Sequence, residues 1–203
     1  MNFWSIEQDL LEQGYKIICG VDEAGRGPLA GDVFAAAVVL PFNADIPGLD
    51  DSKKLTETKR NMLFDEIVAK ALAYSVATAS SVEIDEINIL QATYLAMNRA
   101  IEGVSAQMGI EAPGISMIDG NRNDGIKYNN ICVVRGDSKS ASIAAASILA
   151  KVSRDRYMIE MSVKYPQYGF EKHKGYGTKL HYEKLREHGS SEIHRKTFLR
   201  KLS

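Results

Sequence analysis

The stretch from Ile17 to Pro28 reads IICGVDEAGRGP and contains the strongest signal in the chain. An apolar run ends there in two adjacent carboxylates, Asp22 and Glu23, and opens into a glycine-rich turn. A second apolar run, Val33 to Leu40, follows the turn, so the pattern predicts a β-hairpin. Because neighbouring carboxylates at a strand end cost free energy unless positive charge lies against them, we expect a cationic partner here.

Two more aspartates end or follow apolar runs. Asp119 lies in the sequence IDGNR, and Asp137 lies in RGDSKS. Taken singly, Asp119 is explained as a turn former and Asp137 as a helix N-cap. Taken together with Asp22 and Glu23, they would place four carboxylates on neighbouring strand ends, an arrangement that suits hard divalent cations.

In the rest of the chain, the spacing of apolar residues alternates between the period of an α-helix and the period of a β-strand. Helices are expected over 5–13, from Thr56 to about 72, from an N-cap at Asp85, from Ser138 or Ser140 to before Pro166, and over 178–187. Strands are expected over 74–80, 115–119 and 131–134. Strands mixed with helices predict a three-layer α/β domain.

Composition sets bounds on the class of protein. A chain of 203 residues with 45% apolar residues forms one large domain, with or without a small appendage. Residues 151–203 carry 13 Lys and Arg against 6 Asp and Glu, whereas residues 1–150 carry 12 against 20. This asymmetry fits an acidic site beside a basic surface that meets a polyanion, although a solvated helix face would explain it equally.

Cysteine usage and hydropathy point to an intracellular protein. Cys19 and Cys132 lie inside apolar runs, where we expect buried, reduced side chains. No N-terminal segment resembles a signal peptide and no apolar run reaches membrane-spanning length, so a cytoplasmic location is the default expectation.

The glycine turn allows several interpretations. Gly25, Gly27 and Ala30 match a dinucleotide-binding G-x-G-x-x-A pattern, but that site needs a helix directly after the turn, where this sequence predicts a strand. A plain structural hairpin is the stronger alternative. The glycines would also let the backbone approach a ligand closely, such as a sugar hydroxyl or a phosphate.

The C-terminal part interleaves aromatic residues with lysines. The segment 170–178 reads FEKHKGYGT, a composition that suits nucleic acid because amines meet phosphates and rings meet sugars or bases. Lys53 and Lys54 could do similar work, and Ser138 to Ser140 offer donors near a helix N-terminus. The four histidines at 173, 181, 188 and 194 match no zinc-binding spacing, so we expect surface or structural roles for them.

Several segments together resemble type 2 ribonuclease H (ribonuclease HII). The matching segments, in the family's order, are GVDEAGRGPLAG (20–31), LDDSKKL (49–55), NILQAT (88–93), IDGNR (118–122), GDSKSASIAAASILAKV (136–152) and YGF to GYGT (168–178). The resemblance implies a ribonuclease H-like α/β fold, a mixed sheet flanked by helices, with a helical C-terminal extension. It implies a catalytic domain over 1–165 and a basic extension over 166–203 that packs on it.

The resemblance also implies an activity. The family hydrolyses the RNA strand of RNA–DNA hybrids and cuts on the 5′ side of single ribonucleotides in duplex DNA, leaving 3′-OH and 5′-phosphate ends. It implies catalysis with two Mn2+ or Mg2+ ions, and a monomer. Carried onto this sequence, the catalytic and metal-binding residues are Asp22, Glu23, Asp119 and Asp137. The substrate-binding residues are Gly25, Arg26, Gly27, Lys53, Ser138, Lys139, Ser140 and Tyr176.

The sequence departs from the family's pattern at two places, and one competing class of function remains. Asp32 stands where the family commonly has proline, and the loop 123–125 differs from the usual form; neither position is expected to touch a ligand. The competing hypothesis is a non-catalytic binding module, with the basic tail for nucleic acid and the acidic residues for a structural ion.

Overall fold

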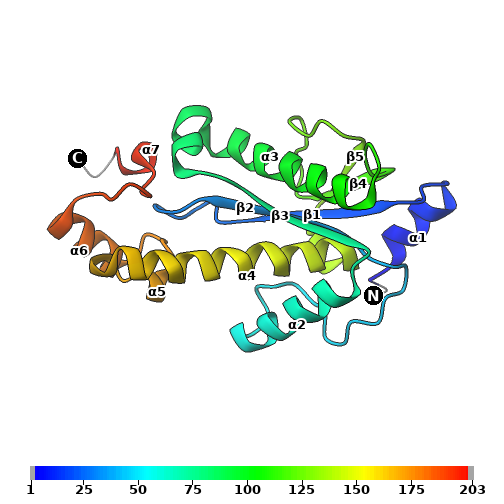
Figure 1. Cartoon of the computed structure of the whole chain (residues 1–203), viewed down its shortest axis with the longest axis horizontal. Helices are drawn as coiled ribbons and strands as arrows, with labels where there is room; N and C mark the ends of the chain where they lie inside the picture. The colour runs from blue at the N-terminus through cyan, green and yellow to red at the C-terminus, as the bar shows by residue number, and fades with distance from the viewer. Residues whose placement is uncertain (1–2, 201–203) are drawn as a thin grey trace.

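The computed structural model describes residues 3–200, so the last three residues of the predicted extension lie outside it. Five strands form one sheet, and helices cover both of its faces (Figure 1). The elements are α1 (Ser5–Glu12), β1 (Ile18–Ala24), β2 (Val33–Val39), α2 (Glu57–Lys70), β3 (Ala73–Ala79), α3 (Ser81–Met108), β4 (Ile115–Asp119), β5 (Asn130–Val133), the 3-10 turn η1 (Gly136–Ser138), α4 (Ala141–Lys164), η2 (Pro166–Tyr168), α5 (Phe170–His173), α6 (Lys179–His188) and α7 (Lys196–Leu199).

The sheet is mixed, which confirms the predicted fold class. Its strand order is β3-β2-β1-β4-β5. Strands β1, β2 and β3 form an antiparallel meander, whereas β4 pairs in parallel with β1 and β5 pairs in parallel with β4. The parallel register sets Val21 opposite Ile118, so the next residues along, Asp22 and Asp119, end neighbouring strands at the same edge.

The two faces of the sheet carry separate apolar cores. Helix α3 covers one face, and α4 with α2 beside it covers the other (Figure 1). Every residue of β2 is buried, and its side chains alternate: Ala35 and Ala37 join the α3 core, whereas Ala36 and Val38 join the α4 core. A strand buried on both faces reads as a continuous apolar run, as the sequence of β2 does.

Small residues bring α4 unusually close to β1. The first half of α4 reads ASIAAASILA and is entirely buried. At Gly20 the approach is so close that a Cβ atom would lie 2.2 Å from the backbone carbon of Ser142. Gly20 and Asp22 lie on the same face of β1, so this contact places Asp22 beside α4.

The predicted strands and helices are confirmed, with one error at a helix start. Helix α3 begins at Ser81 after a capping box formed by Ser80 and Glu83, and not at Asp85. The capping box satisfies backbone N–H groups at the helix start, which leaves Asp85 inside the first part of the helix. Its carboxylate instead accepts hydrogen bonds from the backbone N–H groups of Lys196 and Thr197.

Two further observations refine the sequence-based expectations. Cys19 is buried as expected, but Cys132 is only half-buried because it lies on the edge strand β5; both are free thiols. Within residues 3–200, no helix combines the length and the apolarity that crossing a bilayer requires.

Three of the four histidines are buried and structural. His173, His181 and His194 pack around Phe170 at the end of the molecule where α5 and α6 lie. The N–H of Ser191 donates to Nδ1 of His194, so the proton of this ring is on Nε2. That Nε2–H donates to Nε2 of His181 at 3.0 Å, and Nδ1–H of His181 donates to the carbonyl of Tyr176 at 3.0 Å. Both rings are therefore neutral in this network.

Burial lowers the pKa of His181 and the pKa of His194 to about 4. In the unfolded chain both rings have ordinary pKa values near 6.5. Between pH 6.5 and pH 4 the unfolded chain therefore binds protons that the folded rings do not bind. The free energy of unfolding consequently falls as the pH falls through this window, by at most about 1.4 kcal/mol per pH unit for each ring.

We predict that replacing His194 with Gln flattens this dependence. Denaturant unfolding followed by circular dichroism between pH 7 and pH 4.5 measures it in both proteins. Buried carboxylates with raised pKa values titrate in the opposite sense, so the difference between the two curves, and not either slope alone, isolates the histidine. Parallel curves would show that His194 is already protonated in the folded protein.

Candidate active site

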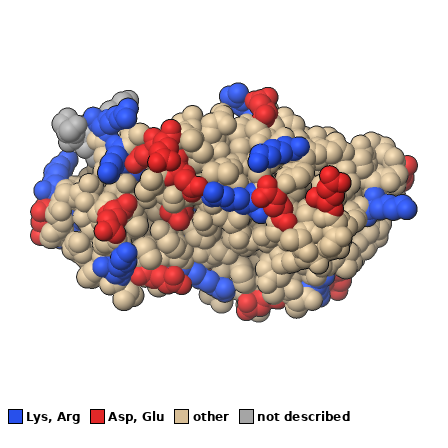
Figure 2. All heavy atoms as spheres, turned by 45° about the horizontal axis from the view of Figure 1, so that its top comes forward, with Lys and Arg blue, Asp and Glu red and all other residues tan. Residues whose placement is uncertain are grey.

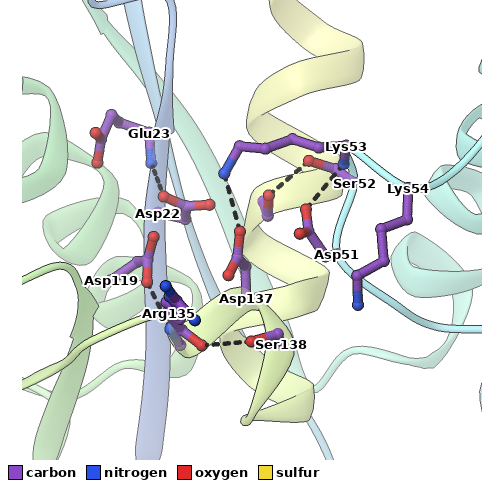
Figure 3. A network of polar contacts seen from close by, with 12 residues as sticks. Asp22, Glu23, Asp51, Ser52, Lys53, Lys54, Asp119, Arg135, Asp137 and Ser138 are labelled. Carbon is purple, nitrogen blue, oxygen red and sulfur yellow. Dashed lines mark hydrogen bonds and ion pairs between the residues drawn. The ribbon is translucent and has the colours of Figure 1, made fainter.

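Three aspartates from separate elements converge at one edge of the sheet (Figure 3). Asp22 comes from β1, Asp119 ends β4, and Asp137 lies in η1 just before α4. Each of them offers a carboxylate oxygen, and these oxygens all lie within 4.8 Å of one another. Asp22 is 4% exposed and Asp137 is 5% exposed, so the cluster is withdrawn from bulk water.

Backbone groups fix two of these carboxylates. The N–H of Glu23 donates to Oδ1 of Asp22 at 2.7 Å, and the N–H of Gly136 donates to Oδ1 of Asp119 at 2.6 Å. The second contact ties the end of β4 to the turn that carries Asp137. A Cβ atom at Gly136 would lie 3.2 Å from that same Asp119 oxygen, so a glycine suits this tight approach.

Glu23 lies apart from the other three carboxylates. It is not a member of the group that shares the 4.8 Å separation. Its Oε1 lies 3.3 Å from Nη1 of Arg26, and Figure 3 shows its carboxylate pointing away from Asp137. Successive residues of a strand face opposite sides of the sheet, which separates Glu23 from Asp22 despite their adjacency.

The cluster is electrostatically unfavourable when it is empty of cations. Burial raises the pKa of Asp22 well above its usual range, and the charges of Glu23 and Asp119 raise it further. Burial also raises the pKa of Asp119, against the opposing hydrogen bond from Gly136. Buried oxygen ligands with surplus negative charge are the environment that hard divalent cations stabilise, so these residues fit such ions.

Lys53 is the cation that meets the cluster. Its Nζ donates to Oδ2 of Asp137 at 3.0 Å, and Figure 3 shows the side chain reaching across from the loop before α2. Partial burial would lower the pKa of Lys53, but the hydrogen bond and charge of Asp137 outweigh this and raise it. Lys53 beside Asp137 and Arg26 beside Glu23 therefore supply the positive charge expected near these carboxylates.

A cleft of about 480 Å³ lies over the cluster. Gly25, Arg26 and Gly27 form one wall, and Tyr176, which is 44% exposed, forms part of another. A Cβ atom at Gly27 would lie 3.9 Å from Cε1 of Tyr176, so the turn and this ring are neighbours. The turn leads directly into β2 and not into a helix, which agrees with the expectation against a dinucleotide site.

Four residues in or beside the cleft were not predicted from the sequence: Ser52, Arg60, Ser147 and Lys151. Ser147 of α4 shares a 2.8 Å hydrogen bond with Ser52, and Arg60 of α2 donates to the carbonyl of Ser52 at 3.1 Å. Lys151 also lines the cleft. Ser147 and Lys151 lie four residues apart on one face of α4, a spacing that would have flagged them once Asp137 was placed before that helix.

The residues from Ser138 to Ser140 have partners within the protein. The hydroxyl of Ser138 donates to the carbonyl of Arg135, and Nζ of Lys139 donates to the carbonyl of Val134. Ser140 is fully buried; its hydroxyl donates to Glu7 at 2.6 Å and accepts from the N–H of Ile143. Ser140 is thus the N-cap of α4, and its geometry favours a structural role over contact with a phosphate.

Charge on the surface is mixed. On the face shown in Figure 2, lysines and arginines alternate with acidic residues. Within the cleft, by contrast, Arg26, Lys53, Arg60 and Lys151 surround the carboxylates. The cleft therefore offers four cations to a polyanion, and phosphates that meet them could approach the acidic cluster.

Comparison with known proteins places this chain in a family. The sequence profile described as "Ribonuclease HII" matches residues 19–201. A protein named Ribonuclease HII from Caldicellulosiruptor bescii is 56% identical over 201 residues, which cover 99% of this chain and 95% of that protein. The crystal structure of ribonuclease H2 from Pyrococcus horikoshii has a TM-score of 0.71 at 29% identity, over 89% of this chain and 93% of that one.

A more distant structure shares the fold. A crystal structure described as Bst-RNase HIII in complex with Mn2+ has a TM-score of 0.71 at 18% identity, over 90% of this chain and 67% of that one. The family match removes the alternative of a non-catalytic binding module. This chain belongs to the ribonuclease HII family, as a metal-dependent endoribonuclease that cleaves the RNA strand of RNA–DNA hybrids.

Proposed function

We propose that this protein also cuts duplex DNA on the 5′ side of single embedded ribonucleotides, leaving 3′-OH and 5′-phosphate ends. The observation that carries the proposal is the adjacency of three parts in one cleft: the acidic cluster, the Gly25–Gly27 turn and Tyr176. Cleavage and recognition of the 2′-OH can then act on the same nucleotide. The protein works as a monomer in the cytoplasm.

Asp22, Asp119 and Asp137 are the proposed metal ligands, and Glu23 would join them through a bound water or by turning away from Arg26. The proposed cofactor is a pair of Mn2+ or Mg2+ ions; Mn2+ is the ion named for the Bst-RNase HIII structure. When bound, such ions neutralise phosphate charge and lower the pKa of a ligated water.

The remaining residues bind and orient the substrate. The lysine and arginine side chains of the cleft meet phosphates, with Lys53 nearest to the reacting group because it already lies against Asp137. Ser138 and Lys139 are candidates for phosphate contacts at the outer side of η1. Backbone N–H groups of the Gly25–Gly27 turn meet the 2′-OH, and the ring of Tyr176 packs on the adjoining deoxyribose.

The first prediction from the proposed function concerns Asp137→Asn. The substitution keeps the shape of the side chain and removes one negative charge from the cluster, so cleavage of a duplex with one ribonucleotide should fall at least about 100-fold. Cleavage is measured on a labelled duplex with Mg2+ or Mn2+, and a reaction with EDTA serves as the metal-free control. Asp124→Asn, at an exposed position paired with Arg122, is the matched control and should cut normally. Full activity of Asp137→Asn would exclude the aspartate cluster as the catalytic centre.

The second prediction separates junction recognition from general cutting. Tyr176→Ala should lower kcat/KM about tenfold on the single-ribonucleotide duplex and less on a long hybrid, because a ring that stacks on deoxyribose acts only at an RNA–DNA junction. Tyr176→Phe keeps the ring and should behave like the unaltered protein. Equal losses on both substrates would contradict a junction role for this side chain.

The third prediction concerns metal affinity without substrate. Because Lys53 donates to Asp137, it competes with divalent ions for the same carboxylate. Lys53→Met should tighten Mn2+ binding about two- to fivefold while raising KM for the substrate. Electron paramagnetic resonance titration of free Mn2+ measures the affinity. Lys54→Met is the control, because Lys54 pairs with Asp50 outside the cluster. Weaker Mn2+ binding by Lys53→Met would show that the lysine supports the metal site instead of competing with it.

A further inference from the structure

One buried arginine from the C-terminal segment holds the glycine turn. Arg195 is 0% exposed, and its guanidinium donates to four carbonyls of a single loop. Nη2 donates to Gly25 at 2.6 Å, Nη1 to Arg26 at 2.9 Å and to Pro28 at 2.8 Å, and Nε to Gly31 at 2.9 Å. The planar guanidinium thus fixes the orientation of four peptide groups of this loop, two of which, those of Gly25 and Arg26, are successive.

The orientation of a carbonyl determines the orientation of the next N–H. A trans peptide is planar, so its C=O and its N–H point in opposite directions. When the carbonyls of Gly25 and Arg26 point at Arg195, the N–H groups of Arg26 and Gly27 must point away from it. Both of these residues line the cleft above the acidic cluster.

A second buried arginine holds the neighbouring part of the loop. Arg154 of α4 donates to the carbonyls of Ala30, Asp32 and Lys174. A Cβ atom at Gly25 would lie 2.0 Å from Nε of Arg154, and Gly25 has a φ of +95°, so glycine is required there on both counts. The hydrogen bonds of Arg154 begin beyond the Gly25–Gly27 turn, which leaves those carbonyls to Arg195.

The segment that carries Arg195 is itself anchored. The N–H of Arg195 donates to Leu29, and the N–H of Gly31 donates to Ile193, so residues 29–31 and 193–195 pair in the manner of an antiparallel ladder. The carboxylate of Asp85 accepts from the next two backbone N–H groups, those of Lys196 and Thr197. The guanidinium is therefore held on both sides.

We propose that Arg195 is a positioning residue for ribonucleotide selectivity: by fixing the carbonyls of Gly25 and Arg26, it aims the N–H groups of Arg26 and Gly27 into the cleft. The inference rests on the proposed function, because it assigns the aimed groups to the 2′-OH. Arg195 does not touch the substrate. Donors fixed before the substrate arrives need no reorganisation on binding, which is where the selectivity comes from.

A role confined to stability would give a different kinetic signature. Loss of folded protein lowers the apparent kcat and leaves KM unchanged, because the molecules that remain folded are normal. Loss of positioning instead raises KM for the duplex with one ribonucleotide and leaves the binding of an all-DNA duplex unchanged. The ratio of the Ki of an all-DNA competitor to the KM of the ribonucleotide substrate therefore separates the two roles.

The experiment measures this ratio with Mg2+ for the unaltered protein and for Arg195→Lys, with thermal melting as the check on folding. Lysine keeps the charge but cannot reach all four carbonyls, so the ratio should fall about fivefold. The matched control is Arg156→Lys, which alters an exposed arginine of α4 whose guanidinium lies over the ring of Phe64 in α2; it should leave the ratio unchanged.

A second variant covers the case in which Arg195→Lys does not fold. Asp85→Ala loosens the anchor of the segment without altering the buried guanidinium, and should lower the same ratio by a smaller factor. An unchanged ratio in folded Arg195→Lys, or in Asp85→Ala where the first variant does not fold, would overturn the proposal. If the unaltered protein fails to cut the single-ribonucleotide duplex, the proposed function fails instead.

Discussion

The parallel pairing of β1 with β4 is the constraint on which the site depends. This pairing places Asp22 and Asp119 at the same edge of the sheet, where their carboxylates lie close together. Close packing of α4 against Gly20 then sets the start of that helix beside them, and with it Asp137. The stability of the sheet and helices therefore holds together three like charges that would otherwise separate.

Such an arrangement makes cations part of the local balance of charge. The three aspartates have two ways to lower their energy: protonation, which the raised pKa values of Asp22 and Asp119 reflect, or contact with positive charge. Lys53 supplies one such contact from the loop before α2. Because this lysine meets both Asp137 and, in the proposed complex, a phosphate, binding of metal and binding of substrate are linked through a single side chain.

Much of the fold was predictable because its signals are local. The apolar runs that end in Asp22 and Asp119 mark strands, and the small apolar start of α4 marks a buried helix. The separation of Glu23 from the aspartates was not predictable from adjacency, because it depends on which face each side chain takes. The burial of Arg195 was not predictable for a different reason. An arginine in a basic tail is normally a surface charge, and this one is buried only because the chain returns to residues 25–31.

His181 and His194 are neutral because burial, and then repulsion by a neighbouring histidine ring, lowers their pKa values. Arg154 and Arg195 lie close enough for their charges to repel, and Asp32 supplies nearby negative charge. A protonated His194 would add a third positive charge next to Arg195. The neutral His194–His181 hydrogen bond instead joins the segment that carries Arg195 to the carbonyl of Tyr176 without adding charge. The turn and the tyrosine, which are far apart in the sequence but neighbours in the cleft, are thereby both held by buried polar groups.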